Sequence, residues 1–245
     1  MINIFKACFV RLLKNIYYRA GLLIAAVVTF LFTSKSASVF FLKGRGENDI
    51  AVFISIAMVF FFSIFVPVFL GAEYAEGSFR NKLICGYSQL EVYLGNFLAL
   101  SASAVIMIAV WFVFSLIGGA ALTAELTGYL AITVFYIIAL ISFLTLIGLR
   151  AKKVSSAVML SIGALFISYN MMIFGNALMM NAEGTTFEVL RGFYNITGLG
   201  QWFSSTCFYD EEINAGNLFK IVISLLMIAI TSLLGIAGIN KRDVN

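Results

Sequence analysis

Residues 73–96 read EYAEGSFRNKLICGYSQLEVYLGN, and they separate two long apolar segments of the chain. The stretch holds three acids and two bases, whereas the 23 residues before it hold no charge. Gly86 is suited to end a helix, because glycine tolerates the left-handed conformation at that position. Residues 88–91 fit the S-x-x-E capping box that opens the next helix. The stretch therefore predicts one short helix over about residues 79–85, capped by Ser78 and set between two membrane-spanning helices.

The composition identifies an integral membrane protein. The chain has 245 residues, of which 62% are hydrophobic and 11% are charged, and its mean hydropathy is +1.01. A soluble domain is about half apolar and about a quarter charged, so a soluble enzyme is excluded. The apolar runs are much longer than the strands of a membrane barrel, which alternate over about ten residues. We therefore expect an all-α bundle.

The apolar runs predict six transmembrane helices in a single permease domain over residues 1–245. Before them, residues 1–18 are amphipathic and are expected to form an interfacial helix, its bases toward lipid headgroups. Residues 183–220 are rich in aromatic side chains but too charged to span, and they predict re-entrant or short helices before the last span. The six expected spans are about 20–42, 50–72, 96–120, 126–149, 154–178 and 221–240.

The distribution of lysine and arginine orients the bundle. If the N-terminus is cytoplasmic, eleven of the sixteen bases lie in cytoplasmic segments and eight of the twelve acids lie on the far side. Both termini are then cytoplasmic, and so is the segment 73–91. Lys35, within the first predicted span, is expected to reach toward the far surface, and Lys220 is counted with the exterior segment.

Much familiar chemistry is missing from this sequence. It has no histidine, and Cys8, Cys85 and Cys207 are too far apart in sequence to form a C-x-x-C pair. We therefore predict no catalytic residue and no metal site. There is no P-loop sequence, so ATP hydrolysis would need a partner subunit. No acid lies deep in a span, which argues against a stand-alone carrier driven by an ion gradient. We expect no nucleic-acid partner.

The spans contain few unusual residues. Pro67 is the single proline, and it removes a backbone hydrogen bond near the end of the second span. It is interpreted as a hinge or, equally, as a static kink. Four polar residues lie within spans and are explained by hydrogen bonding between helices or, alternatively, by a substrate path. They are Ser101, Ser103, Asn170 and Asn176.

The opening stretch resembles a known family. Its pattern is similar to that of bacterial ABC-2-type transporter permeases, roughly E-Y-x-x-G-T-[IF]-R-N-K-L-x-x-G-x-S-R-x-x-[IV]-Y-L-x-N. The similarity covers about 24 residues, and the layout of spans and loops agrees with it. Two positions depart from the pattern. Ser78 stands where threonine is usual, and Gln89 stands where arginine is usual, which removes one base.

The resemblance implies an assembly. Two permease chains, identical or homologous, would join two copies of an ATPase subunit that binds ATP and magnesium. The short helix would be the coupling helix, which docks on the ATPase and reorients the spans. The complex would lie in the bacterial cytoplasmic membrane and export an amphipathic or hydrophobic substrate, such as a drug, a lipid-like molecule or an antimicrobial peptide. The alternatives are a stand-alone secondary carrier or channel, and a peptide-immunity or sensor protein.

Six residues of the stretch suit this coupling role. Three apolar side chains at helical spacing would fill a groove on the ATPase. Two bases would pair with its acids or, alternatively, with lipid headgroups. One acid at the membrane border would set the angle between the second span and the short helix. The three apolar side chains are Phe79, Leu83 and Tyr87, the two bases are Arg80 and Lys82, and the acid is Glu73.

Overall fold

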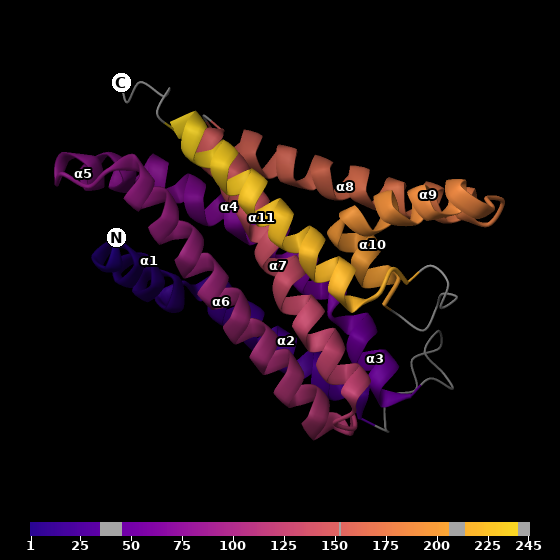
Figure 1. The fold of residues 1–245 in the computed structure, drawn as a ribbon. Coiled ribbons are helices and arrows are strands. Elements are labelled where there is room, and N and C mark those ends of the chain that lie inside the picture. Colours follow the sequence, from indigo (N-terminus) through magenta and orange to yellow (C-terminus); the bar gives the residue numbers. More distant parts are fainter. Residues whose placement is uncertain (35–45, 152, 206–213, 240–245) are drawn as a thin grey trace.

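The structure, a computed structural model, describes residues 1–34, 46–151, 153–205 and 214–239. All regular elements in these ranges are helices (Figure 1). They are α1 (Ile2–Lys14), α2 (Ile16–Thr33), α3 (Glu47–Ile54), α4 (Ile56–Ala75), α5 (Ser78–Ile84), α6 (Gln89–Gly118), α7 (Ala124–Arg150), α8 (Val154–Met179), α9 (Gly184–Ile196), α10 (Gly198–Phe203) and α11 (Asn217–Ile239).

Six segments are long and apolar enough to cross a membrane, which confirms the predicted fold class and the number of spans. They are α2, α3 with α4, α6, α7, α8 and α11. Helix α6 has 30 residues, so at 1.5 Å per residue it measures about 45 Å and exceeds the hydrocarbon core of about 30 Å. The protein is therefore a multi-pass helical membrane protein.

Helix α7 lies at the centre of the bundle. It packs against α4, α6, α8, α10 and α11. Half of the residues in the most apolar window of α4, α6 and α7 are buried within the chain, whereas about a fifth are buried in α2, α8 and α11. The three outer helices expose leucine, isoleucine, valine and phenylalanine side chains that suit a lipid environment.

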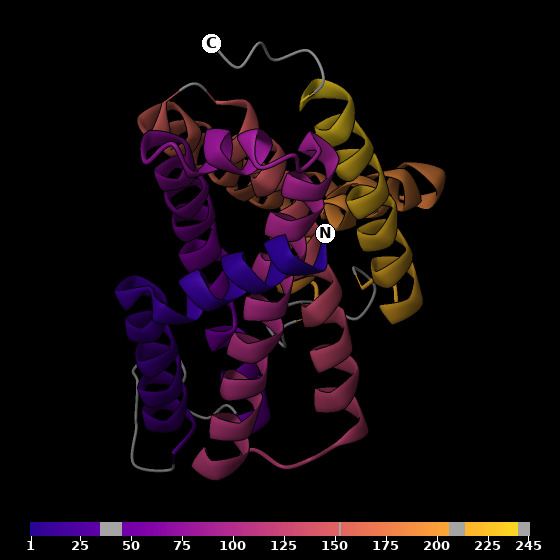
Figure 2. The same ribbon diagram turned by 90° about the vertical axis from the view of Figure 1, so that its left-hand side faces the viewer.

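One end of the bundle gathers segments from across the sequence. Helix α5, helix α1 and the C-terminal end of α11 lie at this end, with α3 at the other (Figure 1). We call it the α5 end. Helix α1 lies across α6 and packs against it (Figure 2). Gly95 permits this approach, because a Cβ atom there would meet Cγ2 of Ile4 at 2.6 Å.

Several predicted boundaries were wrong. The amphipathic segment does not run on to residue 18: α1 ends at Lys14, and Asn15 caps α2 by accepting from the amides of Tyr17 and Tyr18. The first span thus starts at Ile16, and its described helix ends at Thr33, whereas the predicted stretch from 35 to 42 falls outside the described residues. The prediction for Lys35 falls outside the described residues.

The burial pattern of α1 shows which of its faces packs on the bundle. Ile4, Cys8 and Leu12 are buried, one turn apart, against the bundle. Ile2, at the start of the same helix, and Ile16, the first residue of α2, are exposed.

The segment before the last span forms α9 and α10, as short helices were predicted to do there. Trp202 on α10 is buried and donates from Nε1 to the carbonyl oxygen of Val52 on α3, at 3.1 Å. The last span begins at Asn217 and not at 221, so Lys220 belongs to α11. Its side chain is fully buried, where the sequence had placed it in an exterior segment. Its Nζ donates to Ser205 Oγ at 2.6 Å.

Candidate functional site

The local structure around α5 follows from its glycines. Gly77 has φ +70° and Gly86 has φ +88°, and both values lie in the left-handed region that favours glycine. Gly86 ends α5 as predicted. Ser78, however, does not cap the helix: it is the first helical residue, and the N-cap position is occupied by Gly77. Only Glu76, the C-cap of α4, and Gly77, the N-cap of α5, lie between the two helices, and the positive φ of Gly77 turns the chain there.

The start of α6 matches its prediction. Ser88 Oγ accepts from the Glu91 amide at 3.2 Å, and the Glu91 side chain accepts from the Ser88 amide at 3.0 Å. This reciprocal capping box satisfies two of the amide groups that a helix start leaves unpaired. Helix α5 is thus bounded on both sides by turns of defined geometry.

A buried carboxylate lies where α5 meets the bundle. Glu73 is in the last turn of α4, and its side chain is 1% exposed. A carboxylate is unfavourable there for two reasons: burial removes its hydration, and the C-terminal end of a helix carries partial negative charge. It therefore needs partners with positive charge or hydrogen-bond donors.

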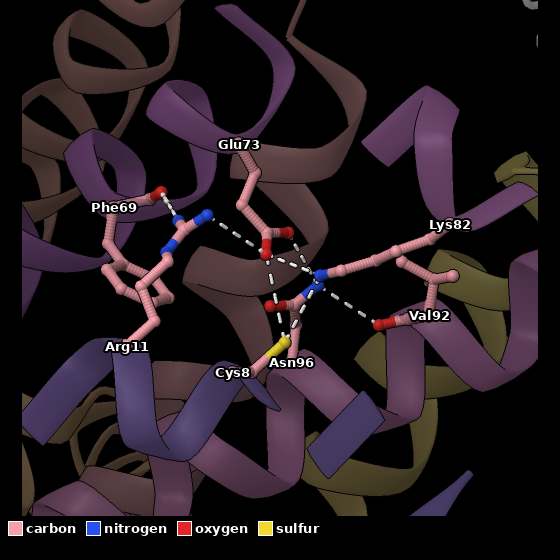
Figure 3. Close-up of polar contacts among 7 residues, drawn as sticks. All are labelled: Cys8, Arg11, Phe69, Glu73, Lys82, Val92 and Asn96. Carbon is pink, nitrogen blue, oxygen red and sulfur yellow. Dashed lines mark hydrogen bonds and ion pairs between the residues drawn. The ribbon is translucent and has the colours of Figure 1, made fainter. Parts of the chain in front are cut away.

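The partners of Glu73 come from three other helices (Figure 3). Lys82 on α5 places Nζ 2.5 Å from Oε1, and Arg11 on α1 places an Nη atom 3.3 Å from the same oxygen. Asn96 on α6 donates from Nδ2 to Oε2 at 2.9 Å. We call these four residues, together with Cys8, the Glu73 cluster.

Further contacts fix the orientation of each partner. Arg11 donates to the carbonyl oxygen of Phe69 at 3.0 Å, and its guanidinium lies 4.4 Å from the centre of the Phe69 ring. Asn96 Nδ2 is shared with the carbonyl oxygen of Val92 at 3.1 Å. Arg11 of α1 thus contacts α4 at both Phe69 and Glu73, and Asn96 is held by its own helix α6, so α1, α4, α5 and α6 together determine the position of Glu73.

Cys8 completes the cluster. Its Sγ lies 3.7 Å from Glu73 Oε1 and 3.2 Å from Lys82 Nζ. Burial raises the pKa of the Cys8 thiol, and the nearby Glu73 carboxylate raises it further. Cys8 is therefore a neutral thiol at neutral pH. The cluster then holds one carboxylate and two cations, a net charge of +1, and its thiol is protected from reaction.

The apolar residues predicted for α5 face the chain itself. Phe79 is buried and stacks on Tyr74 with ring centres 4.5 Å apart. Leu83 and Tyr87 are partly buried and pack against the core. Phe79 is thus enclosed by the chain itself, whereas Leu83 and Tyr87 keep part of their surface exposed, and the role of the three side chains in filling a groove on a partner stays a prediction. The exposed positions of α5 are Arg80, Asn81 and Ile84, followed by Cys85.

The two predicted bases of α5 differ in their surroundings. Lys82 is 18% exposed and is bound to Glu73. Arg80, two residues earlier, is exposed and forms no ion pair with any residue that the structure describes. The structure therefore brings together Glu73 and Lys82 of the predicted set, and leaves Arg80 on the outer face.

The remaining predicted residues lie apart from the cluster. Pro67 is buried within α4, which continues through it. Two cavities lie between helices of the bundle, and none of the four polar residues predicted for a substrate path lines either of them. Ser103 and Asn170 instead donate to carbonyl oxygens of their own helices, at 2.6 and 2.8 Å. These two side chains therefore bond within their own helices and do not make the predicted bonds between helices.

Sequence reasoning missed Cys8, Arg11 and Asn96. Arg11 and Cys8 were interpreted as part of a lipid-facing helix, and Asn96 as the first residue of a span. The sequence did hold one signal for Asn96, because an amide at the border of an otherwise apolar segment is costly to bury without a partner. No protein-family model and no curated protein matches this chain. The following proposal rests on the geometry and on the resemblance of residues 73–96.

Proposed function

We propose that this chain is the transmembrane subunit of an ATP-driven exporter of the ABC-2 type, energised by a separate ATPase. The substrate would be amphipathic or hydrophobic, as in the family that the α5 region resembles. The observation that carries the proposal is the construction of α5: a short helix at one end of the bundle, exposed on one side and joined to three other helices on the other.

This construction suits the transmission of force. A displacement of α5 would act on Lys82 and hence on Glu73 in α4, because the two are ion-paired. Glu73 also holds Arg11 of α1 and Asn96 of α6. A partner that pushes α5 would therefore move α1, α4 and α6 together and would not merely bend a loop. In addition, the Tyr74 hydroxyl donates to the carbonyl oxygen of Leu149, which extends the connection to the end of α7.

The docking surface that we propose is the outer face of α5. Arg80 supplies an exposed positive charge, and Ile84 supplies an apolar side chain that is 72% exposed. An apolar anchor beside a cation is suited to a groove that is apolar and lined by acids. Gln89 is only half-buried and follows the helix. Its neutral amide leaves Arg80 as the main cation of this face.

The test uses two double variants. A tagged chain is purified, with mild crosslinking, from membranes of the cells that encode it, and ATP hydrolysis in the eluate is measured. Arg80→Glu with Ile84→Asp should remove co-purified hydrolysis, whereas Arg80→Lys with Ile84→Val should retain it because charge and apolar character are kept. The absence of hydrolysis with the unaltered chain would contradict the proposal, as would full hydrolysis with the first double variant. Transport by the purified chain alone would favour a stand-alone carrier.

A further inference from the structure

A cavity lies between helices, most of which take no part in the Glu73 cluster. Its volume is about 350 Å³, and its walls come from α4, α7, α8, α10 and α11. Aromatic and aliphatic side chains, including Tyr136, Leu140 and Phe143, form much of the lining, and Gln201 of α10 lies at one side. We call it the inner cavity. All the residues that line it in this structure belong to one copy of the chain.

One wall of the inner cavity carries an unsatisfied polar residue. Ser63 of α4 lines the cavity and is 1% exposed, yet its Oγ has no hydrogen-bond partner among the described residues. Pro67 lies four residues later and has no amide hydrogen, so the Ser63 carbonyl also lacks its usual helical donor. An unpaired hydroxyl and a carbonyl without its usual helical donor thus lie at one residue, in a region without bulk water.

The remaining polar groups of the lining are neutral. Ser161 donates to the carbonyl oxygen of Ala157 at 2.9 Å, and Ser224 donates to Gln201 Oε1 at 3.3 Å. Within the described part of the chain, no charged side chain lines the cavity. An ionic ligand would therefore lose its hydration without gaining a counter-charge, which disfavours it. An uncharged ligand with a hydroxyl or carbonyl group meets no such penalty.

We propose that the inner cavity binds an uncharged, mainly apolar molecule that carries one alcohol or ester group, and that Ser63 is its polar contact. The hydroxyl of Ser63 donates to the oxygen of the ligand, and the apolar part contacts α7 and α8. The cavity has roughly twice the volume of one that binds benzene, about 150 Å³, so a single medium-length chain fits and a two-chain phospholipid does not. The proposal does not depend on the proposed function, because it concerns binding and not transport.

The test uses octanol that carries a diazirine as a photoreactive probe. The purified full-length chain in detergent is irradiated with increasing probe concentrations, and adducts are located by mass spectrometry. We expect saturable labelling of the cavity lining on α4, α7 and α8, reduced by unlabelled octanol. Ser63→Ala should weaken the apparent affinity on the order of fivefold, the usual value of one neutral hydrogen bond. Ala164→Phe, which fills the cavity, should abolish saturable labelling.

Ser101→Ala is the matched control. Ser101 is also a buried serine whose Oγ has no partner among the described residues, but it lines neither cavity. Its variant should label like the unaltered chain. Elution as a single species in gel filtration checks that each variant is folded, and Ser63→Ala tests the proposal even if Ala164→Phe does not fold. Non-saturable labelling overturns the proposal, as does adduct formation confined to outward-facing residues. Equal affinities of the Ser63 and Ser101 variants overturn it too.

Discussion

Replacing Lys82 by methionine should destabilise the folded chain, because it removes one of the two cations on a buried carboxylate. Methionine keeps much of the length and the apolar stem of lysine, so the change acts mainly on charge. Loss of a hydrogen bond to a charged group costs about 1.5–3 kcal/mol, and breaking a fully buried ion pair costs about 3–5 kcal/mol. The lower range applies here, because Lys82 is 18% exposed and Arg11 remains 3.3 Å from Glu73.

The expected change is measurable as a shift in thermal unfolding. For a chain of this size, 1 kcal/mol corresponds to about 2–4 °C in Tm, so the Lys82→Met variant should unfold about 3–12 °C lower in detergent. Arg80→Met is the control, since Arg80 is an exposed base on the same helix. Its effect should stay within about 0.5 kcal/mol. Equal Tm values for the two variants would refute the assignment of Lys82 to the cluster.

A double-mutant cycle isolates the pairwise contact. Glu73→Gln removes the buried charge, so the loss of Lys82 should matter less in that background. We expect a coupling of about 1–3 kcal/mol between the two positions, in the range for residues that share one ion-pair network. The same cycle made with Glu73 and Arg80 should show no coupling energy. A coupling near zero for Glu73 and Lys82 would mean that the contact contributes nothing to stability.

Two other predictions concern the flanking structure. Ser88→Ala removes one half of the capping box and should lower the free energy of unfolding by about 1 kcal/mol, measured as a Tm shift. Ser88→Thr keeps the hydroxyl and should retain most of the stability that the cap provides. In a Cys207→Ser background at neutral pH, maleimide should modify the exposed Cys85 well before the buried Cys8. Folding raises the pKa of the Cys8 thiol. The contribution of this shift to stability is therefore complete below the ordinary thiol pKa and is lost as the pH rises through the raised pKa of the folded state. Maleimide labelling of Cys8 should increase over the same alkaline range. Fast labelling of Cys8 at neutral pH would contradict its burial.

The sequence predicted those parts of the fold that depend on neighbours along the chain. Long apolar runs identified the six spans, and the S-x-x-E pattern placed the start of α6 at the correct residue. Gly86 was correctly expected to end α5. The cap of α5 was wrong because Gly77 and Ser78 are adjacent and either residue type can occupy an N-cap position. Gly77 prevails, since the chain turns there with a positive φ.

The Glu73 cluster was only partly predictable, because its members are distant in the sequence. Arg11 was expected to face lipid headgroups, and Glu73 was expected to set the angle between the second span and the short helix. Their ion pair could be recognised only once α1 was seen to lie across α6. The burial of Lys220 likewise depends on contacts between segments that are distant in the sequence. Its position near a span end suggested an exterior segment, and only the return of α10 onto α11 encloses it. Packing between distant helices decided both cases.

The order of synthesis has a consequence for how the Glu73 cluster assembles. Cys8 emerges from the ribosome 65 residues before Glu73 and 74 residues before Lys82. Translation proceeds at about 5–20 residues per second, so several seconds pass between the synthesis of α1 and the synthesis of Glu73 and Lys82. During that interval α1 can bind to the membrane surface as an amphipathic helix, with its bases at the lipid headgroups. The amphipathic character of α1 would then serve the nascent chain, and closure of the cluster would mark the completed insertion of α4 and the first turns of α6.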